Sequence, residues 1–353
     1  MADHFHLKTY ERSGGRRLCL YSAAPTTYQL FDGLPAVDSS SAHMRKHPLT
    51  GEWIGHASAR QGRTFLPNAA DCPFCCMSAD SDLTDIPVDH YEVAIFSNRF
   101  SALTAAPDAP PELGIETAPG TGICEVISYS DDHHASLSTI GVDRIALLVA
   151  AVGAQSTDLL ANDAIQYVLP FENRGREIGV TIDHPHGQIY ALSHVPNIVA
   201  RTAAAFDVSN PLADLVQTMA DDLVLMKNDI GMAFVPEWAR YPFEVWVAPY
   251  RRVASPDDLT PAEQAGFAAL LDGAAKKLDA VAGGIMPLTM SWQIAPKGHE
   301  GSFHFHCQFQ PLKRSKTKQK FLASVEQFTG FFLVDLPPEK AANILNGKID
   351  ADD

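Results

Sequence analysis

The sequence predicts an α+β fold in which one unit, an antiparallel sheet flanked by helices, occurs twice in tandem. One observation is an internal repeat. The segment His184–Leu192 has a weak copy at His304–Leu312, and both read His-x-His-x-Gln and end in leucine. A second is that each half places a strand candidate, a loop and a helix candidate before its copy. A third is size: 353 residues, 46% of them hydrophobic, supply enough core for one large or two medium domains.

The repeat divides the chain into three parts. Residues 1–42 are predicted to be an N-terminal extension, because they contain only two short apolar stretches before a polar run. Residues 43–205 are predicted to form the first repeat. Residues 206–353 are predicted to form the second, degenerate repeat and a C-terminal tail.

Within the repeats, apolar runs and loop composition predict the individual elements. In the first, we expect a strand at 93–96, a surface loop rich in Pro, Ala and Gly at 104–120, and a helix at 142–152. In the second, we expect a strand at 245–247 and a helix at 261–281. This last helix has a clear start signal, since Thr260-Pro-Ala-Glu263 is a capping box with proline at the first helical position.

Composition narrows the class of protein. The net charge of −15 argues against general nucleic-acid binding, which needs a basic surface, but it allows a local basic pocket for a small phosphorylated metabolite. No apolar run is long enough for a membrane span, and the first residues do not resemble a secretory leader, so we expect a cytoplasmic protein. In such a protein the six cysteines are more often thiols or metal ligands than disulfides.

The segment His184-Pro-His-Gly-Gln188 is the strongest functional signal. In a strand, alternate side chains share a face, so His184, His186, Gln188 and Tyr190 are predicted to point the same way. Two imidazoles and an amide on one face are costly in a plain core, because each polar group needs a partner. The pattern therefore favours a functional site over a structural one.

The residues before this segment have the chemistry of a phosphate-binding loop. Phe171-Glu-Asn-Arg-Gly175 and Gly179-Val-Thr181 supply an amide, a guanidinium, a hydroxyl and flexible backbone. Glycines let backbone amides approach phosphate oxygens closely, and arginine pairs with those oxygens. We therefore predict that a phosphorylated substrate binds next to the histidines.

Together these motifs resemble the galactose-1-phosphate uridylyltransferases, a branch of the histidine-triad superfamily. The likeness covers about residues 43–345 and includes the segment from Phe171 to Ile189 as well as Pro48–Ile54, Arg60-x-x-Arg63, Phe96-x-Asn98-x-Phe100, Tyr241–Glu244 and His304-x-His306. It implies that the repeated unit is a histidine-triad-like fold.

The resemblance also implies a ping-pong transfer. His186 would attack the α-phosphorus of UDP-glucose and form a uridylyl-histidine, from which galactose 1-phosphate would collect the uridylyl group. Imidazole suits this role because it is neutral and nucleophilic near pH 7. Gln188 would stabilise the phosphoryl oxygens as charge builds. The same resemblance implies that Asn173 and Thr181 contact the transferring phosphoryl group. It also implies that the nucleotide or its phosphates are bound by Arg60, Arg63 and Asn98.

The C-terminal tail resembles the acceptor-binding part of the family. The stretch Lys320–Glu326 matches one in which a glutamate contacts the hexose hydroxyls, in some members from the partner subunit, so we expect a homodimer with Lys320 and Glu326 at the substrate. A glutamine that often follows is replaced near Phe332, which leaves the choice of hexose open.

A zinc site is predicted beside the nucleophile. The spacing Cys72-Pro-Phe-Cys75 is that of a zinc knuckle. The resemblance adds His133 and His184 as the other ligands of one structural zinc. A second metal site of some relatives is expected to be absent, because Thr202 and Gln293 stand where a glutamate and a histidine are needed; His304 and His306 would then be remnants of the repeat.

Three alternatives stay open at this point. The first is an adenylyl-transferring nucleotide-sugar phosphorylase of the same superfamily. The second is a zinc-dependent phosphohydrolase in which His184 and His186 both bind a metal that activates water, since strand neighbours two apart can share an ion. The third is a nucleotide-binding module without catalysis.

Overall fold

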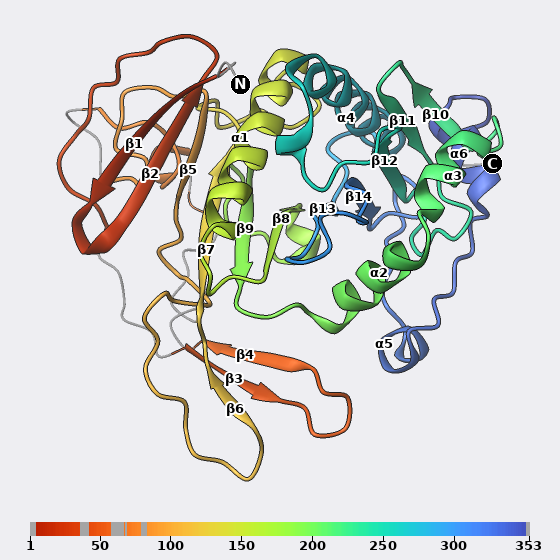
Figure 1. The fold of residues 1–353 in the computed structure, drawn as a ribbon. Coiled ribbons are helices and arrows are strands. Elements are labelled where there is room, and N and C mark those ends of the chain that lie inside the picture. Colours follow the sequence, from red (N-terminus) through yellow and green to blue (C-terminus); the bar gives the residue numbers. More distant parts are fainter. Residues whose placement is uncertain (1–4, 36–41, 58–66, 68, 79–82, 351–353) are drawn as a thin grey trace.

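The structure is a computed structural model that describes residues 5–35, 42–57, 67, 69–78 and 83–350. Its centre is an eleven-stranded sheet with the order β1-β2-β5-β7-β9-β8-β13-β14-β12-β11-β10, and every pair of neighbouring strands in it is antiparallel (Figure 1). The strands of this sheet are β1 (His6–Arg12), β2 (Arg16–Ser22), β5 (Val93–Ser97), β7 (Gly122–Ser128), β8 (Tyr167–Arg174), β9 (His186–Leu192), β10 (Val224–Lys227), β11 (Gly231–Phe234), β12 (Val245–Pro249), β13 (Leu288–Gln293) and β14 (His306–Pro311).

The strand order displays the duplication that the sequence predicts. From the centre outward, β8, β9, β7, β5 and β2 on one side are matched by β13, β14, β12, β11 and β10 on the other. The two halves meet where β8 pairs with β13, with Arg174 opposite Leu288 and Phe171 opposite Ser291. The predicted α+β fold of two tandem units with antiparallel strands and flanking helices is therefore confirmed, and the two units share one continuous sheet.

Two long helices cover one face of this sheet. They are α1 (Val142–Leu160) and α4 (Pro261–Ala282), which contact each other in the structure. The predicted capping box is present, because Thr260 accepts from the Glu263 amide while the Glu263 carboxylate accepts from the Thr260 amide. The helix ends at Gly283, whose φ of 67° is a left-handed conformation that glycine adopts without strain.

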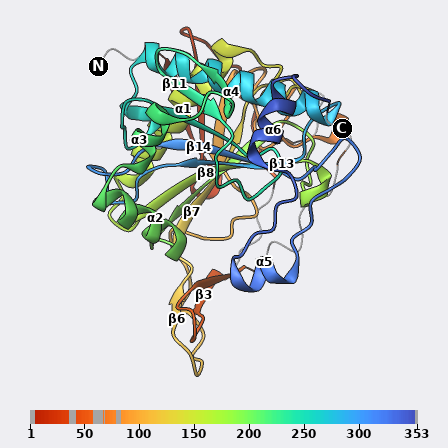
Figure 2. The same cartoon turned by 90° about the vertical axis from the view of Figure 1, so that its right-hand side faces the viewer.

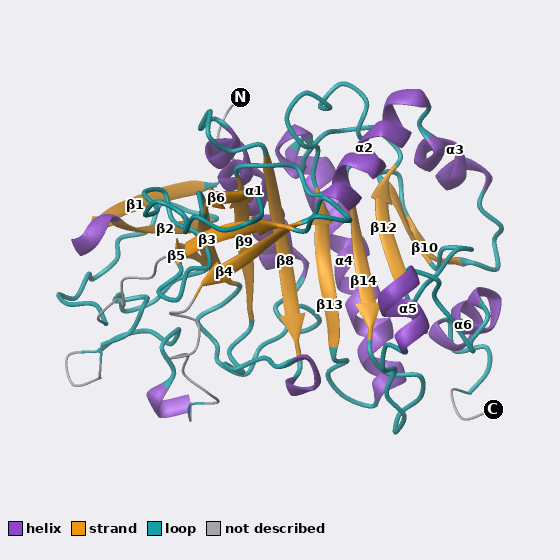
Figure 3. Cartoon of the chain, turned by 90° about the horizontal axis from the view of Figure 1, so that it is seen from below, coloured by secondary structure: helices purple, strands orange, loops and turns teal. Residues whose placement is uncertain are grey.

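Two shorter helices, α2 (Asn197–Val208) and α3 (Pro211–Thr218), lie on the opposite face (Figure 3). Their residues Phe206, Leu212 and Val216 belong to a core cluster with Phe234 of β11. The tail contains α5 (Ser324–Thr329) and α6 (Pro338–Leu345). In the described part of the chain, no helix has the length and apolarity that crossing a bilayer requires.

A second, three-stranded sheet projects from the body (Figure 2). It has the order β4-β3-β6 and consists of β3 (Ala42–Lys46), β4 (Trp53–Ala57) and β6 (Thr117–Pro119). The predicted loop at 104–120 thus ends in a short strand, because the backbone at residues 117–119 pairs with β3. The strands β1 and β2 of the predicted N-terminal extension join the main sheet beside β5. The division of the chain at residues 42 and 205 stays a prediction.

Alternation along β9 positions the site. Ile189 and Ala191 are fully buried in the core with the long helices, so His186, Gln188 and Tyr190 lie on the other face. The prediction that His184, His186, Gln188 and Tyr190 share one strand face needs a strand that begins at His184. In the structure the strand begins two residues later, at His186. His184 precedes the strand, and its ring nitrogens contact the Ser130 carbonyl and the sulfurs of Cys72 and Cys75.

Candidate active site

His186 is held in one tautomer by the backbone. Its Nδ1–H donates to the carbonyl of His184 at 2.7 Å, so the lone pair on Nε2 is left for chemistry. Burial lowers the pKa of His186, which keeps the ring neutral near pH 7. The ring of Phe74 lies edge-on to the imidazole at 5.1 Å and restricts its rotation. These contacts preorganise a neutral nitrogen nucleophile at the start of β9.

A glycine next to the histidine lets β9 approach its neighbours. A Cβ at Gly187 would lie 2.5 Å from the Tyr129 hydroxyl and 2.8 Å from the Phe171 carbonyl, distances that no side chain tolerates. The main chain between His186 and Gln188 is therefore pinned between β7 and β8. This contact explains why a glycine separates the two polar residues.

Two cavities meet at His186. The first is lined by His186, Gln188, Asn98 and Thr181 together with aromatic residues of the Phe96–Phe100 segment. The Asn98 amide nitrogen lies 3.5 Å from the Gln188 side-chain oxygen, which leaves the Gln188 NH₂ group to donate to a substrate oxygen. Four of the predicted site residues are thus brought together in this cavity.

The second cavity lies behind the nucleophile. It has a volume of about 290 Å³ and is lined by His184, His186, Asn173 and residues 174–176. Asn173 reaches it from β8, the strand next to β9. The segment that the sequence marks as phosphate-binding is therefore divided: Thr181 lines one cavity beside His186 and Asn173 the other.

Cys72, Cys75, His133 and His184 form a cluster whose candidate ligand atoms all lie within 4.8 Å of one another. Both cysteine sulfurs face His184 Nδ1, at 3.7 and 3.5 Å, and Cys75 Sγ lies 3.4 Å from His133 Nδ1. The cluster contains all four predicted ligands and is assembled from the knuckle, the loop after β7 and the residue before Pro185.

The geometry of this cluster fits a metal ion. Sulfur and nitrogen ligands of a tetrahedral zinc, at about 2.3 and about 2.0 Å from the ion, lie about 3.5 Å apart. Three of the four sulfur–nitrogen distances in the cluster span 3.4–3.7 Å. A hydrogen bond from the Cys75 thiol lowers the pKa of Cys72, which favours the thiolate that a metal binds. The four residues can therefore hold one metal ion.

His184 is oriented for this role by groups around its other nitrogen. Its Nε2 lies 2.7 Å from the Ser130 carbonyl and 3.0 Å from the Tyr91 hydroxyl. Donation from Nε2–H to the carbonyl leaves Nδ1 as the ligand atom, the arrangement usual in metal-binding histidines. The buried Tyr91 hydroxyl also donates to the Phe74 carbonyl at 2.8 Å, so it connects the knuckle to His184.

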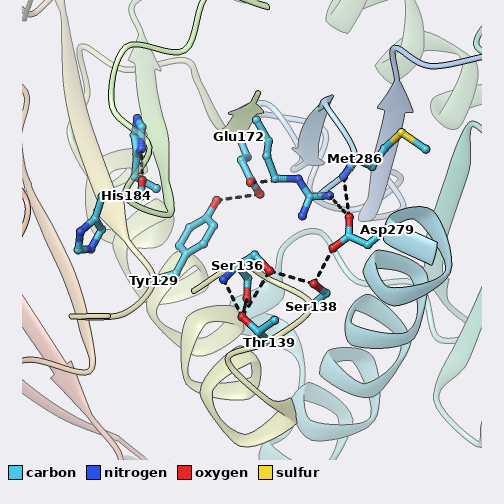
Figure 4. A network of polar contacts seen from close by, with 10 residues as sticks. Tyr129, Ser136, Ser138, Thr139, Glu172, His184, Asp279 and Met286 are labelled. Atoms are coloured by element: carbon cyan, nitrogen blue, oxygen red, sulfur yellow. Dashed lines mark hydrogen bonds and ion pairs between the residues drawn. The ribbon is translucent and has the colours of Figure 1, made fainter. Parts of the chain in front are cut away.

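A buried polar network connects the site to the second half (Figure 4). The Tyr129 hydroxyl, which packs on Gly187, donates to Glu172 at 3.4 Å. Burial raises the pKa of Glu172. Arg174 lies 3.8 Å from Glu172 and 3.6 Å from Asp279 of α4, and Asp279 also accepts from Ser138 at 2.6 Å. Since Ser138 follows His133 in the same loop, α4 of the second half holds the loop of the metal cluster.

The predicted acceptor residues lie elsewhere in the same chain. Lys320 Nζ donates to Glu326 at 2.5 Å and to the Leu333 carbonyl at 3.0 Å, and both side chains are buried. They line a cavity of about 430 Å³ that shares no residue with the two cavities at His186. Within one subunit the structure does not bring them to the nucleophile. The predicted residues Arg60 and Arg63 lie outside the described residues.

Sequence reasoning missed two side chains of the site. Arg99 lines the cavity with His186, its guanidinium lies 4.8 Å from the Phe100 ring, and its buried Nε has no hydrogen-bond partner among the described residues. Its place between Asn98 and Phe100, in a motif already identified, was an available signal. Tyr91 carried no such signal, because a lone tyrosine before a strand is ordinary in a core.

The second half conserves part of the constellation. Thr202, Gln293 and His306 line one cavity, and His304 Nδ1 lies 3.2 Å from the Asn210 side-chain nitrogen. The expectation that no second metal binds here stays a prediction, because it rests on the residue types alone.

Comparison with known proteins assigns the family. A model of the galactose-1-phosphate uridyl transferase N-terminal domain matches residues 34–196, and a model of the C-terminal domain matches residues 202–352. A galactose-1-phosphate uridylyltransferase of Thermotoga maritima is 32% identical over 86% of this chain and 97% of its own length. One of Haemophilus influenzae is 30% identical over 86% and 93%.

Solved structures agree with the fold. A uridylyltransferase structure superposes with a TM-score of 0.77 at 29% identity, covering 86% of this chain and 97% of the other. An ADP-glucose phosphorylase of Arabidopsis thaliana has a TM-score of 0.65 at 21% identity, over 87% and 99% of the two chains, which shows the shared fold alone. The two family models and the uridylyltransferase superposition define the class as a nucleotidyl-transferring enzyme. The chain belongs to the galactose-1-phosphate uridylyltransferase family.

Proposed function

We propose that this enzyme transfers a uridylyl group from UDP-glucose to a hexose 1-phosphate, galactose 1-phosphate in the first instance, through a covalent intermediate on His186. The observation that carries the proposal is the hydrogen bond from His186 Nδ1 to the His184 carbonyl at 2.7 Å. It leaves a neutral ring whose only free lone pair, on Nε2, lies at a cavity with Gln188 and Thr181.

The two half-reactions balance on this nitrogen. In the first, Nε2 attacks the α-phosphorus, a P–N bond forms, and the P–O bond to glucose 1-phosphate breaks with that oxygen keeping the electron pair. In the second, a phosphate oxygen of the acceptor attacks the same phosphorus and the P–N bond breaks. The proton on Nδ1 stays hydrogen-bonded to the carbonyl throughout, which stabilises the charge that the ring acquires.

The neighbouring residues stabilise the charge that builds on the transferring group. The Gln188 NH₂ group, on the same face of β9 two residues from the nucleophile, donates to a phosphoryl oxygen. Thr181 and Asn173 supply a hydroxyl and an amide on two sides of His186. Asn98, Arg60 and Arg63 are assigned to the nucleotide and its phosphates on the basis of the family motifs.

We propose that the metal ion is a structural zinc held by Cys72, Cys75, His133 and His184. When bound, it joins the knuckle to the residue before the nucleophile strand. His186 is not a member of this cluster, and His184 Nδ1 faces the two cysteine sulfurs. This geometry disfavours a hydrolase in which His184 and His186 share a metal.

We also propose that the enzyme is a homodimer in the cytoplasm. The tail around α5 exposes large apolar side chains, among them Phe321, Phe328 and Phe331, which are 64–86% exposed in the single chain. A partner that covers them would bring Lys320 and Glu326 near the second subunit's acceptor site. The described cysteines form no disulfide with one another, as is usual in a reducing compartment.

Initial rates with purified protein test the reaction. UDP-glucose and ADP-glucose would be offered as donors, each with galactose 1-phosphate or inorganic phosphate as acceptor. We expect UDP-glucose with galactose 1-phosphate to give the highest kcat/KM, and His186→Gly to abolish it. A preference for ADP-glucose with phosphate would instead identify an adenylyl-transferring phosphorylase.

A further inference from the structure

A cavity larger than those at His186 lies over the second half of the sheet. Its volume is about 800 Å³, within the range of small-molecule sites, and it is enclosed between β12, β13 and β14 on one side and α2 and α3 on the other. Figure 3 shows these two helices above the strands. The transfer reaction proposed above makes no use of this space.

The position of this cavity in the sheet is that of the nucleophile pocket in the first half. Val126 of β7 lies opposite Gln188 of β9, and in the second half Trp246 of β12 lies opposite Gln308 of β14. His306 and Gln308 therefore occupy the positions of His186 and Gln188, and Trp246 that of Val126.

The aromatic element is repeated as well. Phe96 of β5 pairs with Val126, and Phe234 of β11 pairs with Trp246, so Phe96 and Phe234 correspond. Phe100 lies four residues after Phe96, and Trp238 lies four residues after Phe234, so Phe100 and Trp238 correspond as well. The cavity is thus a second copy of the aromatic-lined pocket, with tryptophan in place of phenylalanine.

Trp238 offers a surface for a planar ring. It is 40% exposed, although it borders a cavity, and it is supported edge-on by Trp246 at 5.3 Å. A rigid indole that keeps one side open to a pocket is suited to stacking on a heterocycle.

The charge of the cavity is positive. Arg201 and Arg240 line it, and no aspartate or glutamate is among the described residues that do so, although the chain as a whole carries a net charge of −15. Arg240 lies 3.9 Å from Glu244, whose oxygens already accept from two backbone amides and the Trp246 indole. Arg240 also lies 5.6 Å from the Phe332 ring, whereas Arg201 forms no ion pair among the described residues, so the charge that attracts an anion to the cavity comes mainly from Arg201.

The histidine of this copy is not a nucleophile. His306 Nδ1 donates to the His304 carbonyl at 2.8 Å, as in the first half, but Nε2 lies 3.0 Å from the Gln308 amide nitrogen, which donates to it. Trp246 is stacked on the ring at 4.7 Å, and His306 is 1% exposed. Its remaining lone pair is occupied and covered, so a ligand in this cavity is bound without being transferred.

We propose that this cavity is a second, non-catalytic binding site for a nucleoside monophosphate, with the base against Trp238 and the phosphate facing Arg201 and Arg240. The site goes beyond the transfer reaction and does not depend on it. It gives the chain two nucleotide sites, one that reacts and one that only binds.

Equilibrium dialysis of the full-length protein with radiolabelled UMP tests the proposal. We expect two UMP sites per chain in the wild type and also in His186→Gly, which loses the nucleophile and keeps the residues assigned to the nucleotide. Trp238→Ala and Arg201→Gln should each weaken one site about tenfold or more while transfer stays within twofold of wild type. Both residues are at the cavity surface, so the variants should fold; Arg252→Gln, an exposed arginine outside the cavity, is the matched control.

Controls with parts of the ligand separate the two recognition elements. Uridine, which lacks the phosphate, and ribose 5-phosphate, which lacks the base, should each bind the second site much more weakly than UMP. The proposal is overturned by a single UMP site in wild type, or by equal binding of uridine and UMP. It is also overturned if Trp238→Ala leaves both sites intact and converts a dimer to a monomer, because the cavity would then be a subunit contact. If His186 variants keep normal transfer, the proposed function is refuted, whereas the proposal of this second site is unaffected.

Discussion

Asp279→Asn is expected to destabilise the protein by about 3 kcal/mol, although the residue lies in α4 and far along the chain from the nucleophile. The carboxylate accepts from the Ser138 hydroxyl at 2.6 Å and from the Met286 amide at 2.8 Å, and it lies 3.6 Å from Arg174. Hydrogen bonds to a charged group contribute about 1.5–3 kcal/mol each and neutral ones about 0.5–1.5 kcal/mol. Asparagine keeps the volume and one neutral bond. It removes the charge that faces the buried Arg174, and these losses sum to about 3 kcal/mol.

Urea unfolding followed by circular dichroism measures this free energy. Asp272→Asn is the matched control, because it lies on the same helix and loses the i,i+4 ion pair with Lys276, which contributes about 0.2–0.5 kcal/mol. If both variants lose the same free energy within about 0.5 kcal/mol, Asp279 does not join the halves and the network of Figure 4 is not a structural connection.

Three further predictions concern the site and its copy. Gln188→Ala should slow transfer about 100-fold with little change in UDP-glucose binding, because its amide acts on the charge of the transition state; an unchanged kcat would exclude that role. Cys75→Ser should reduce bound zinc, measured by atomic absorption, well below one ion per chain, and full occupancy would remove Cys75 from the ligand set. Burial lowers the pKa of His306 to about 4 from about 6.5 in the unfolded chain, so its contribution to stability is present above pH 6.5 and is lost as pH falls towards 4. Between pH 7 and 5 the wild type should therefore lose about 2 kcal/mol more than His306→Gln, and parallel pH profiles of the two would contradict this.

The parts of the fold that sequence predicted are those with a local signature. The helix at 261–282 has a capping box and helical spacing, and the strand at 93–97 is a short apolar run, so both were within reach of pattern reasoning. The pairing of β8 with β13, which makes the two units one sheet, joins residues more than a hundred positions apart. No local pattern encodes such a contact, because it depends on packing and not on propensity.

The residues of the candidate site show the same difference between local signals and long-range contacts. Spacing alone marked Cys72 and Cys75 of the metal cluster and the His184–Gln188 segment, whereas His133, Asn98 and Thr181 were expected from the family resemblance. The position of His184 was misjudged, because period two along a strand does not foresee that its ring nitrogens bind a carbonyl and two thiols. Lys320 and Glu326 were assigned to substrate, but in one subunit they satisfy each other, a contact that sequence alone does not reveal.

The central claim, that His186 carries the transferred group, is tested most directly by trapping the intermediate. Wild-type protein would be incubated with UDP-glucose labelled at the α-phosphorus, without acceptor, quenched in alkali and digested for peptide mapping. The account predicts one acid-labile label per chain on the peptide that contains His186, discharged by galactose 1-phosphate and absent from His186→Gly. Steady transfer with no label on the protein, or a label that persists in His186→Gly, would contradict it.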